Sequence, residues 1–178
     1  MPSAWAPPRR QGAVMKLGQE EMRSRFEQER AVRLATVDER GRAHVVPIIF
    51  VVDGDTFYSP TDKPKTGNPR PKRLRNLDRD RRATVLADCY DEDWLKAWWV
   101  RLRGTARVID EGAERTRALG LLDGKYEQFD GARYLQDGGP VVAIDITDWL
   151  GWAYSEQSAD TGRRRPWRER SWLRSSRA

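Results

Sequence analysis

Residues 31–76 read AVRLATVDERGRAHVVPIIFVVDGDTFYSPTDKPKTGNPRPKRLRN and decide the fold. Residues 31–37 alternate between apolar and polar side chains and are rich in β-branched residues, which predicts a half-buried strand. A turn follows at Asp38–Gly41, where the glycine can adopt the positive φ of a tight hairpin. Residues 42–52 predict a long apolar strand, and a second turn leads into a short strand at 56–59. The stretch therefore predicts an antiparallel sheet.

Pro47 lies in the middle of the predicted long strand. Proline has no N–H to donate to a ladder, so the strand lies at the edge of the sheet or is bulged at this point. A bulge that bends the strand is the structural interpretation. The functional interpretation is that the interrupted ladder leaves backbone groups of Val46 and Ile48 free to contact a planar heterocycle.

A cationic segment follows the short strand. Lys63 and Lys65 precede a loop rich in Gly, Asn and Pro, and a helix is predicted to start near Lys72. Within this helix Lys72 and Asn76 share a face, so both can reach one phosphate near the helix N-terminus, and Arg75 adds a bidentate donor. The alternative is a basic loop that is only solvated. A sheet that delivers cations to its own end suits a flat ring with an anionic tail.

The rest of the chain predicts three more strands and two more helices. A charged helix is expected at residues 16–30 and an amphipathic helix at 111–122. Strands are expected at 83–87, at 97–109, and at 141–146 with 149–154 continuing the last of them. This order predicts a mainly β protein, a small closed antiparallel barrel of six strands with inserted helices.

Two features of the predicted strand at 97–109 concern its faces and its shape. The neighbours Trp98 and Trp99 must point to opposite faces, so one can enter the core while the other contacts a partner or ligand. Gly104 is expected to bend the strand.

Composition and charge indicate one domain and exclude several classes of protein. The chain has 178 residues, 38% of them apolar, and a net charge of +6. Residues 158–178 hold seven arginines and two acidic residues, which is +5 of that charge, so nucleic-acid binding by the rest is not expected. No apolar run is long enough to span a membrane and no signal peptide is found, which predicts a cytoplasmic protein. We expect a disordered extension at 1–14, the domain at 15–157 and a basic disordered tail at 158–178.

Several familiar sites are missing from the sequence. The single cysteine, Cys89, excludes an internal disulfide, and the only histidine, His44, has no partners for a zinc site. Residues 120–125 look like a phosphate loop but are one residue short, and Tyr126 stands where Ser or Thr would bind magnesium. No G-x-G-x-x-G motif follows a strand, and no paired carboxylates indicate acid–base hydrolysis. We therefore assign no catalytic residue from the sequence.

The order of these motifs resembles that of the pyridoxamine-phosphate-oxidase-like split-barrel superfamily, in particular its actinobacterial branch described as F420-dependent. The resemblance covers about residues 26–154. It rests on RLATVD at 33–38, GRAHVVPI at 41–48, DGDTFY at 53–58, KPK at 63–65, KRLRNL at 72–77, YDEDW at 90–94, and WWVR and GTARV within 98–108.

The resemblance implies a homodimer of six-stranded, FMN-binding-type split barrels with the cofactor at the dimer interface. The cofactor is F420, a deazaflavin, or alternatively FMN, with its ring near Pro47 and its phosphate on the segment after the third strand. The loop at 66–71 leaves open whether Lys63, Lys65 or Lys72 is the main phosphate ligand. The expected cofactor-binding residues are Val46, Pro47, Ile48, Ser59, Thr61, Lys65, Lys72, Arg75, Asn76 and Trp99.

The function implied by the resemblance is hydride transfer between F420 and a small organic substrate whose identity the sequence leaves open. An FMN-dependent oxidase and a non-catalytic carrier of flavin or haem are the alternatives. Tyr126 and Tyr134 are candidate proton donors.

Overall fold

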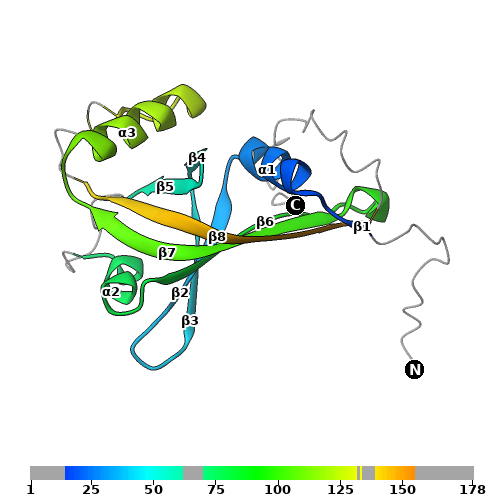
Figure 1. Ribbon diagram of the computed structural model, residues 1–178, viewed down its shortest axis with the longest axis horizontal. Helices are drawn as coiled ribbons and strands as arrows, with labels where there is room; N and C mark the ends of the chain where they lie inside the picture. Colours follow the sequence, from blue (N-terminus) through cyan, green and yellow to red (C-terminus); the bar gives the residue numbers. More distant parts are fainter. Residues whose placement is uncertain (1–14, 62–69, 132, 134–138, 155–178) are drawn as a thin grey trace, which may run out of the picture.

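The computed structural model describes residues 15–61, 70–131, 133 and 139–154. In this part of the chain one antiparallel sheet of eight strands runs in the order β3-β2-β6-β7-β8-β5-β4, with β1 beside β8 (Figure 1). The strands are β1 (Met15–Lys16), β2 (Val32–Val37), β3 (Ala43–Ile48), β4 (Val51–Asp53), β5 (Thr56–Pro60), β6 (Arg82–Cys89), β7 (Trp98–Ile109) and β8 (Val141–Ala153). The helices are α1 (Gln19–Gln28), α2 (Lys72–Arg79) and α3 (Ala113–Lys125), with a 3-10 turn at Trp94–Lys96.

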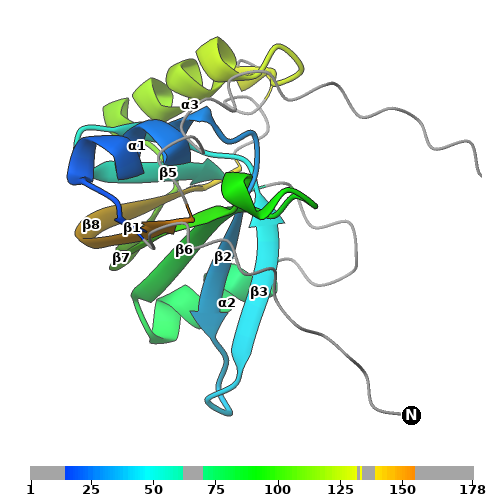
Figure 2. The ribbon, with the colours of Figure 1, turned by 90° about the vertical axis from the view of Figure 1, so that its right-hand side faces the viewer.

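The mainly β antiparallel architecture is confirmed, but the prediction of a closed six-stranded barrel is wrong in strand number and closure. β3 and β4 stand at opposite ends of the hydrogen-bonded order, although only Ile49 and Phe50 separate them along the chain. The sheet must therefore curl until its two ends approach each other, as Figure 2 shows from the side. No pairing joins β3 to β4 within the described residues, so the barrel is open there.

The single long strand predicted at 42–52 is broken into β3 and β4 at Ile49 and Phe50. Phe50 is fully buried, and its backbone N–H and carbonyl both form hydrogen bonds with the side chain of Tyr126, the residue after α3. Its N–H donates to the Tyr126 hydroxyl at 3.0 Å, and that hydroxyl donates to the Phe50 carbonyl at 2.8 Å. The chain can leave the ladder at this corner because Tyr126 satisfies the buried backbone groups.

Pro47 lies on an edge strand, which is one of the two placements, edge or bulge, expected for a proline inside a strand. β3 pairs only with β2, in a register that runs without a shift from Val37↔Ala43 to Val32↔Ile48. The proline is therefore accommodated by the free edge and not by a bulge.

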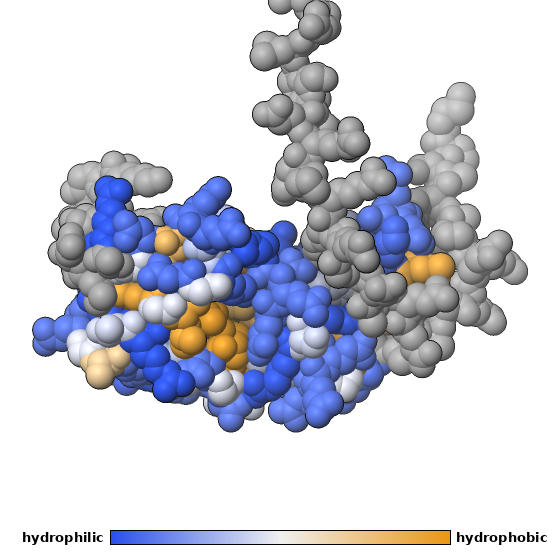
Figure 3. Space-filling view, turned by 90° about the horizontal axis from the view of Figure 1, so that it is seen from above, coloured by the Kyte–Doolittle hydropathy of each residue, from blue (hydrophilic) through white to orange (hydrophobic). Residues whose placement is uncertain are grey.

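Two apolar clusters hold the helices against the sheet. α1 and α2 pack inside the curled sheet, where Phe26, Leu74 and Trp98 join the larger cluster. α3 packs against the other side of β5 and β8 through a smaller cluster that includes Leu119 and Leu122. Seen from above, an apolar patch shows between hydrophilic regions on the side of the molecule where α3 and β4 lie (Figure 3).

The expected bend at Gly104 coincides with the one irregularity in the pairing of β7 with β8. Arg103 pairs with Asp148 and Gly104 with Ile146, so Thr147 is an extra residue on β8. A β carbon on Gly104 would lie 2.3 Å from the backbone oxygen of Asp145 and 2.6 Å from the side chain of Ile144. Only glycine fits where the two strands approach this closely.

Gly104→Ala is expected to lower the free energy of unfolding by about 1–3 kcal/mol or more, because the added methyl group overpacks against backbone. Gly120→Ala is the matched control, since the space around Gly120 in α3 is open and alanine favours a helix by about 1 kcal/mol. Urea denaturation of both variants measures the difference. Equal stability of the two variants would contradict the close approach at Gly104.

The predicted terminal segments at 1–14 and 158–178 lie outside the described residues. Among the described residues, no helix has the length and hydropathy needed to cross a membrane.

Candidate functional site

β3 presents its side chains alternately to the core and to the outside. Val46 is half-buried against the larger cluster and Ile48 is buried in it, so neither side chain faces outward. Pro47 is exposed, and Val45 is 56% exposed. Of the three β3 residues predicted to contact a ring, only Pro47 offers its side chain to a ligand.

The end of β5 carries two buried hydroxyl groups. Ser59 and Thr61 are both buried. The Thr61 N–H donates to the Pro140 carbonyl at 3.0 Å, which holds the chain beside β8 as it leaves the sheet. The Thr61 hydroxyl oxygen is buried and has no hydrogen-bond partner among the residues that the structure describes. Lys63 and Lys65, predicted phosphate ligands, lie outside the described residues.

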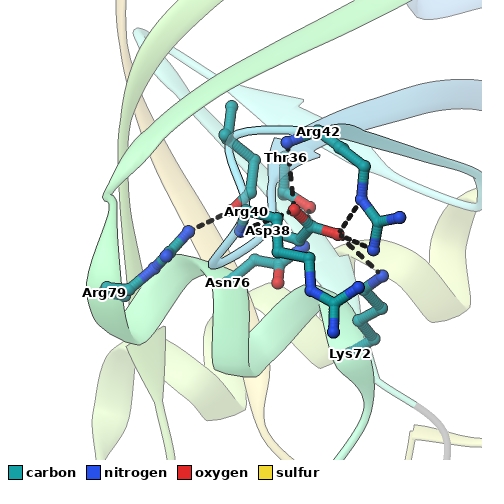
Figure 4. A network of polar contacts seen from close by, with 8 residues as sticks. Thr36, Asp38, Arg40, Arg42, Lys72, Asn76 and Arg79 are labelled. Carbon is teal, nitrogen blue, oxygen red and sulfur yellow. Dashed lines mark hydrogen bonds and ion pairs between the residues drawn. The ribbon is translucent and has the colours of Figure 1, made fainter.

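A network of polar contacts centred on Asp38 joins α2 to the β2–β3 hairpin (Figure 4). The Asp38 carboxylate is buried and accepts the backbone N–H groups of Arg40 and Arg42, both at 3.0 Å. It also accepts the Lys72 amine at 3.2 Å and the Arg42 guanidinium. The Arg42 N–H, the Lys72 ammonium and the Arg40 N–H hold the pKa of Asp38 well below its usual range. Asp38 is therefore a fixed negative charge among cations.

The sequence predicted that Asn76 and Lys72 reach one phosphate together, but the Asn76 side chain does not face solvent. Its side chain is buried, and its amide donates to the Thr36 hydroxyl at 2.9 Å, also buried. The i, i+4 spacing does place Asn76 and Lys72 on one helix face, but this face contacts the hairpin through Thr36 and Asp38. The structure thus gives Asn76 a role in fastening α2 to β2.

Two other cations of α2 differ in their surroundings. Arg75 is exposed, and its side chain makes no hydrogen bond or ion pair with another described residue. Arg79 donates to the Val37 carbonyl at 3.1 Å and so belongs to the hairpin contact. The Lys72 side chain stays 41% exposed despite its ion pair. Arg75 and Lys72 are therefore the predicted phosphate ligands that solvent and a ligand can still reach.

His44 belongs to the same region, although sequence reasoning gave it no role. It is half-buried on β3, and its cross-strand partner is Thr36. Burial first, and then the charges of Lys72 and Arg73, lower the pKa of His44, while Asp38 opposes the shift. His44 is thus neutral at physiological pH and adds no cation to the site.

Trp98 and Trp99 point to opposite faces, as predicted. Trp98 is buried and lies beneath the Arg25 guanidinium, 5.7 Å from the ring centroid. Trp99 is half-buried on the opposite face, where its cross-strand partner on β8 is Trp152. Trp98 is therefore the core residue of the pair, and Trp99 remains the candidate for contact with a partner or ligand.

Tyr126, a candidate proton donor, is committed to the β3–β4 corner. Its side chain is buried, burial raises its pKa, and its hydroxyl makes both hydrogen bonds to Phe50 described above. A group held this way stabilises the fold. Tyr134, the other candidate, lies outside the described residues.

Tyr126→Phe is expected to lower the free energy of unfolding by about 2–4 kcal/mol, because it leaves two buried backbone groups of Phe50 without partners. Tyr90→Phe, at a site 66% exposed, removes the same hydroxyl as a control and is expected to change stability by less than about 0.5 kcal/mol. Thermal denaturation of the two variants is the measurement. A stable Tyr126→Phe protein that had lost activity would instead support the proton-donor role.

Sequence reasoning missed Asp38 and Thr36, the two hairpin residues that receive α2. An aspartate at the start of a turn, three residues before Gly41, is a signal for a side chain that accepts backbone N–H groups of the turn. Nothing local to the sequence indicated that the same carboxylate would also meet Lys72, 34 residues away.

Three solved structures share this fold at low sequence identity. An FAD-binding protein from Mesorhizobium loti is 18% identical with a TM-score of 0.56, over 78% of this chain and 96% of that one. HutZ, the heme storage protein from Vibrio cholerae, is 14% identical with a TM-score of 0.61, over 77% and 96%. The FAD binding protein from Mycobacterium smegmatis is 20% identical with a TM-score of 0.54, over 79% and 97%.

The sequence itself carries a stronger signal than these structures. No relative among curated proteins matches the chain. The family model described as Pyridoxamine 5'-phosphate oxidase matches residues 19–153, which spans every element from α1 to β8. That span includes the edge strand with Pro47, the Asp38 network and the cations of α2. The chain therefore belongs to the pyridoxamine 5'-phosphate oxidase family.

Proposed function

We propose that this protein is an F420-dependent oxidoreductase that acts on a small organic substrate. The observation that carries the proposal is the pair of reachable cations on α2, Arg75 and Lys72, which follow β5 in a fold that also contains an exposed edge strand at Pro47. Flavin-type cofactors combine a flat ring with an anionic tail, and these residues offer a contact surface for each part.

The donor groups present fit a cofactor that carries a phosphate. Within the part of the chain that the structure describes, Arg75 is exposed without an ion pair, and the buried Thr61 hydroxyl has no hydrogen-bond partner. Both would hold the phosphate together with Lys72, whose ammonium Asp38 already positions. Pro47 would contact the ring. When bound, the deazaflavin supplies the hydride, and the protein supplies anchoring and orientation.

Two observations keep other cofactors in view. Proteins of similar fold are described as FAD-binding and as heme storage proteins. An FMN-dependent oxidase or a carrier of flavin or haem would use the same anchors. The family resemblance to an F420-dependent branch favours the deazaflavin.

The absorption spectrum of the purified protein, followed by titration with F420, FMN and haem, tests the proposal. Binding of F420 in preference to FMN, and hydride transfer from reduced F420 to an electron-poor acceptor, are the expected results. Tight binding of FMN or haem with no measurable F420 binding would replace the proposal by the corresponding alternative.

We further propose that the active form is a homodimer. We call outer face the side of the sheet that carries Ala35, Val45, Thr84 and Arg103. The described residues of β2, β3 and β6 on this side belong to neither core cluster. Val45 is 56% exposed on this face, and Trp99 lies on it four residues before Arg103. A second copy that covers these side chains would remove apolar surface from water. Sedimentation at micromolar concentration should show a dimer, and a monomer there contradicts the proposal.

A further inference from the structure

Lys125, the last residue of α3, places its amine on an aromatic ring at the corner between β3 and β4. Its Nζ lies 3.5 Å from the centre of the Phe50 ring and 5.6 Å from the centre of the Tyr126 ring. The corner lies at the end of β3 away from the hairpin that carries Asp38. Phe50 also belongs to the larger core cluster, so its ring is not part of the outer face.

The Lys125 amine is half-buried and has a second cation beside it. The Arg30 guanidinium lies 4.7 Å from the centre of the Tyr126 ring, and it donates to the Lys125 carbonyl at 2.7 Å. Neither cation forms an ion pair within the part of the chain that the structure describes. Two positive charges thus share one ring, and loss of the Lys125 proton relieves their repulsion.

Several effects act on that proton. Burial lowers the pKa of Lys125 to about 8, and the positive charge of Arg30 acts in the same direction, while Glu27 and Glu29 oppose the shift. The face of the Phe50 ring also favours the ammonium form. At pH 7, a pKa of about 8 leaves about a tenth of the amine neutral, against less than about 0.1% for a lysine with the usual pKa of about 10.4.

We propose that Lys125 is a nucleophilic amine that condenses with small aldehydes, above all those that carry an anionic group for Arg30. The amine nitrogen forms a bond to the carbonyl carbon, one water molecule leaves, and a carbon–nitrogen double bond results. The step exchanges no electrons with a further reactant. It does not depend on which cofactor the protein binds.

The aldehyde 4-carboxybenzaldehyde is a suitable probe because it also carries a carboxylate, and benzaldehyde is its neutral counterpart. The full chain is incubated with each aldehyde at pH 7, the imine is reduced with borohydride, and the labelled lysines are located by peptide mass spectrometry. Lys125 is expected to be labelled about tenfold faster or more than the exposed Lys16 and Lys96. The anionic aldehyde is expected to label it faster than benzaldehyde does.

The pH dependence of labelling distinguishes a neutral amine from one that is merely accessible. Only the neutral form attacks the carbonyl carbon, so the labelling rate of Lys125 is expected to rise with pH and level off above a midpoint near pH 8. For a lysine with the usual pKa, the rate continues to rise to about pH 10.

Variants separate the roles of the two cations. Lys125→Arg keeps a positive charge over Phe50 and is expected to lose the label. Arg30→Gln is expected to slow labelling by 4-carboxybenzaldehyde by about tenfold, as the loss of one charge-assisted contact requires, and labelling by benzaldehyde by much less. Arg117→Gln, at an exposed residue of α3 paired with Asp53, is the charge-matched control and is expected to react as the parent protein does.

Labelling of Lys125 no faster than that of Lys16 and Lys96 would overturn the proposal. So would a midpoint near pH 10, because the Phe50 ring would then keep the amine protonated. Equal labelling by the two aldehydes would overturn the anion preference assigned to Arg30. Circular dichroism confirms that each variant is folded before its labelling rate is compared.

Discussion

Replacing Arg75 with alanine is expected to weaken the binding of F420 by about ten- to hundredfold. A charge-assisted hydrogen bond contributes about 1.5–3 kcal/mol, and each 1.4 kcal/mol is a factor of ten in affinity. Lys72→Ala is expected to have a smaller effect, because its ammonium is already shared with the Asp38 carboxylate at 3.2 Å. Calorimetric titration with F420 and with FMN gives the affinities directly.

Asp38 offers a test in the opposite direction. Asp38→Asn keeps an oxygen that can accept the N–H groups of Arg40 and Arg42, but it removes the negative charge beside Lys72. The variant is expected to bind the anionic cofactor more tightly than the parent protein, and the gain should shrink at high salt. Arg117→Ala on α3 is the charge-matched control for Arg75→Ala and Lys72→Ala. If neither Arg75→Ala nor Lys72→Ala binds the cofactor measurably worse, the cations of α2 are only solvated and the cofactor proposal loses its main support.

Phe26→Ala is expected to lower the free energy of unfolding by about 3–5 kcal/mol, the largest stability change expected for one residue here. Phe26 is fully buried and contacts the rings of Phe50, Phe57 and Trp149, at centroid distances of 5.1, 6.3 and 5.3 Å. Through this ring α1 contacts both the corner at Phe50 and Trp149 of β8. Truncation leaves a cavity that three aromatic rings cannot close without leaving their own contacts.

Thermal denaturation should show a fall in Tm of about 10 °C or more for Phe26→Ala. Tyr90→Ala removes an aromatic ring that is 66% exposed, and it is expected to shift Tm by no more than about 2 °C. A Phe26→Ala protein as stable as Tyr90→Ala would show that α1 is not needed to hold the sheet in its curled form.

The strands could be predicted closely wherever local alternation alone decides them. The prediction at 31–37 became Val32–Val37, and that at 97–109 became Trp98–Ile109. A strand of period two with one buried face needs no information from elsewhere in the chain. That Pro47 needs an edge or a bulge followed in the same way, because the missing N–H is a property of the residue itself. The strand order decided for the edge.

The corner between β3 and β4 could not be predicted from the residues that form it. Residues 45–52 are apolar throughout, so the stretch 42–52 favours one unbroken strand. The break at Phe50 is stable only because the Tyr126 hydroxyl, 76 residues away, bonds both of its backbone groups. Without that distant partner the ladder would be the only way to satisfy them.

The sequence by itself determined which cations α2 carries and that Lys72 and Asn76 share one face of it. Helical spacing is local, so this part needed no tertiary information. Only the tertiary structure decided what that face meets. Asp38 is a buried carboxylate that needs a nearby cation, and Thr36 is a buried hydroxyl that needs a partner, so the hairpin takes Lys72 and Asn76 and leaves Arg75 exposed to solvent.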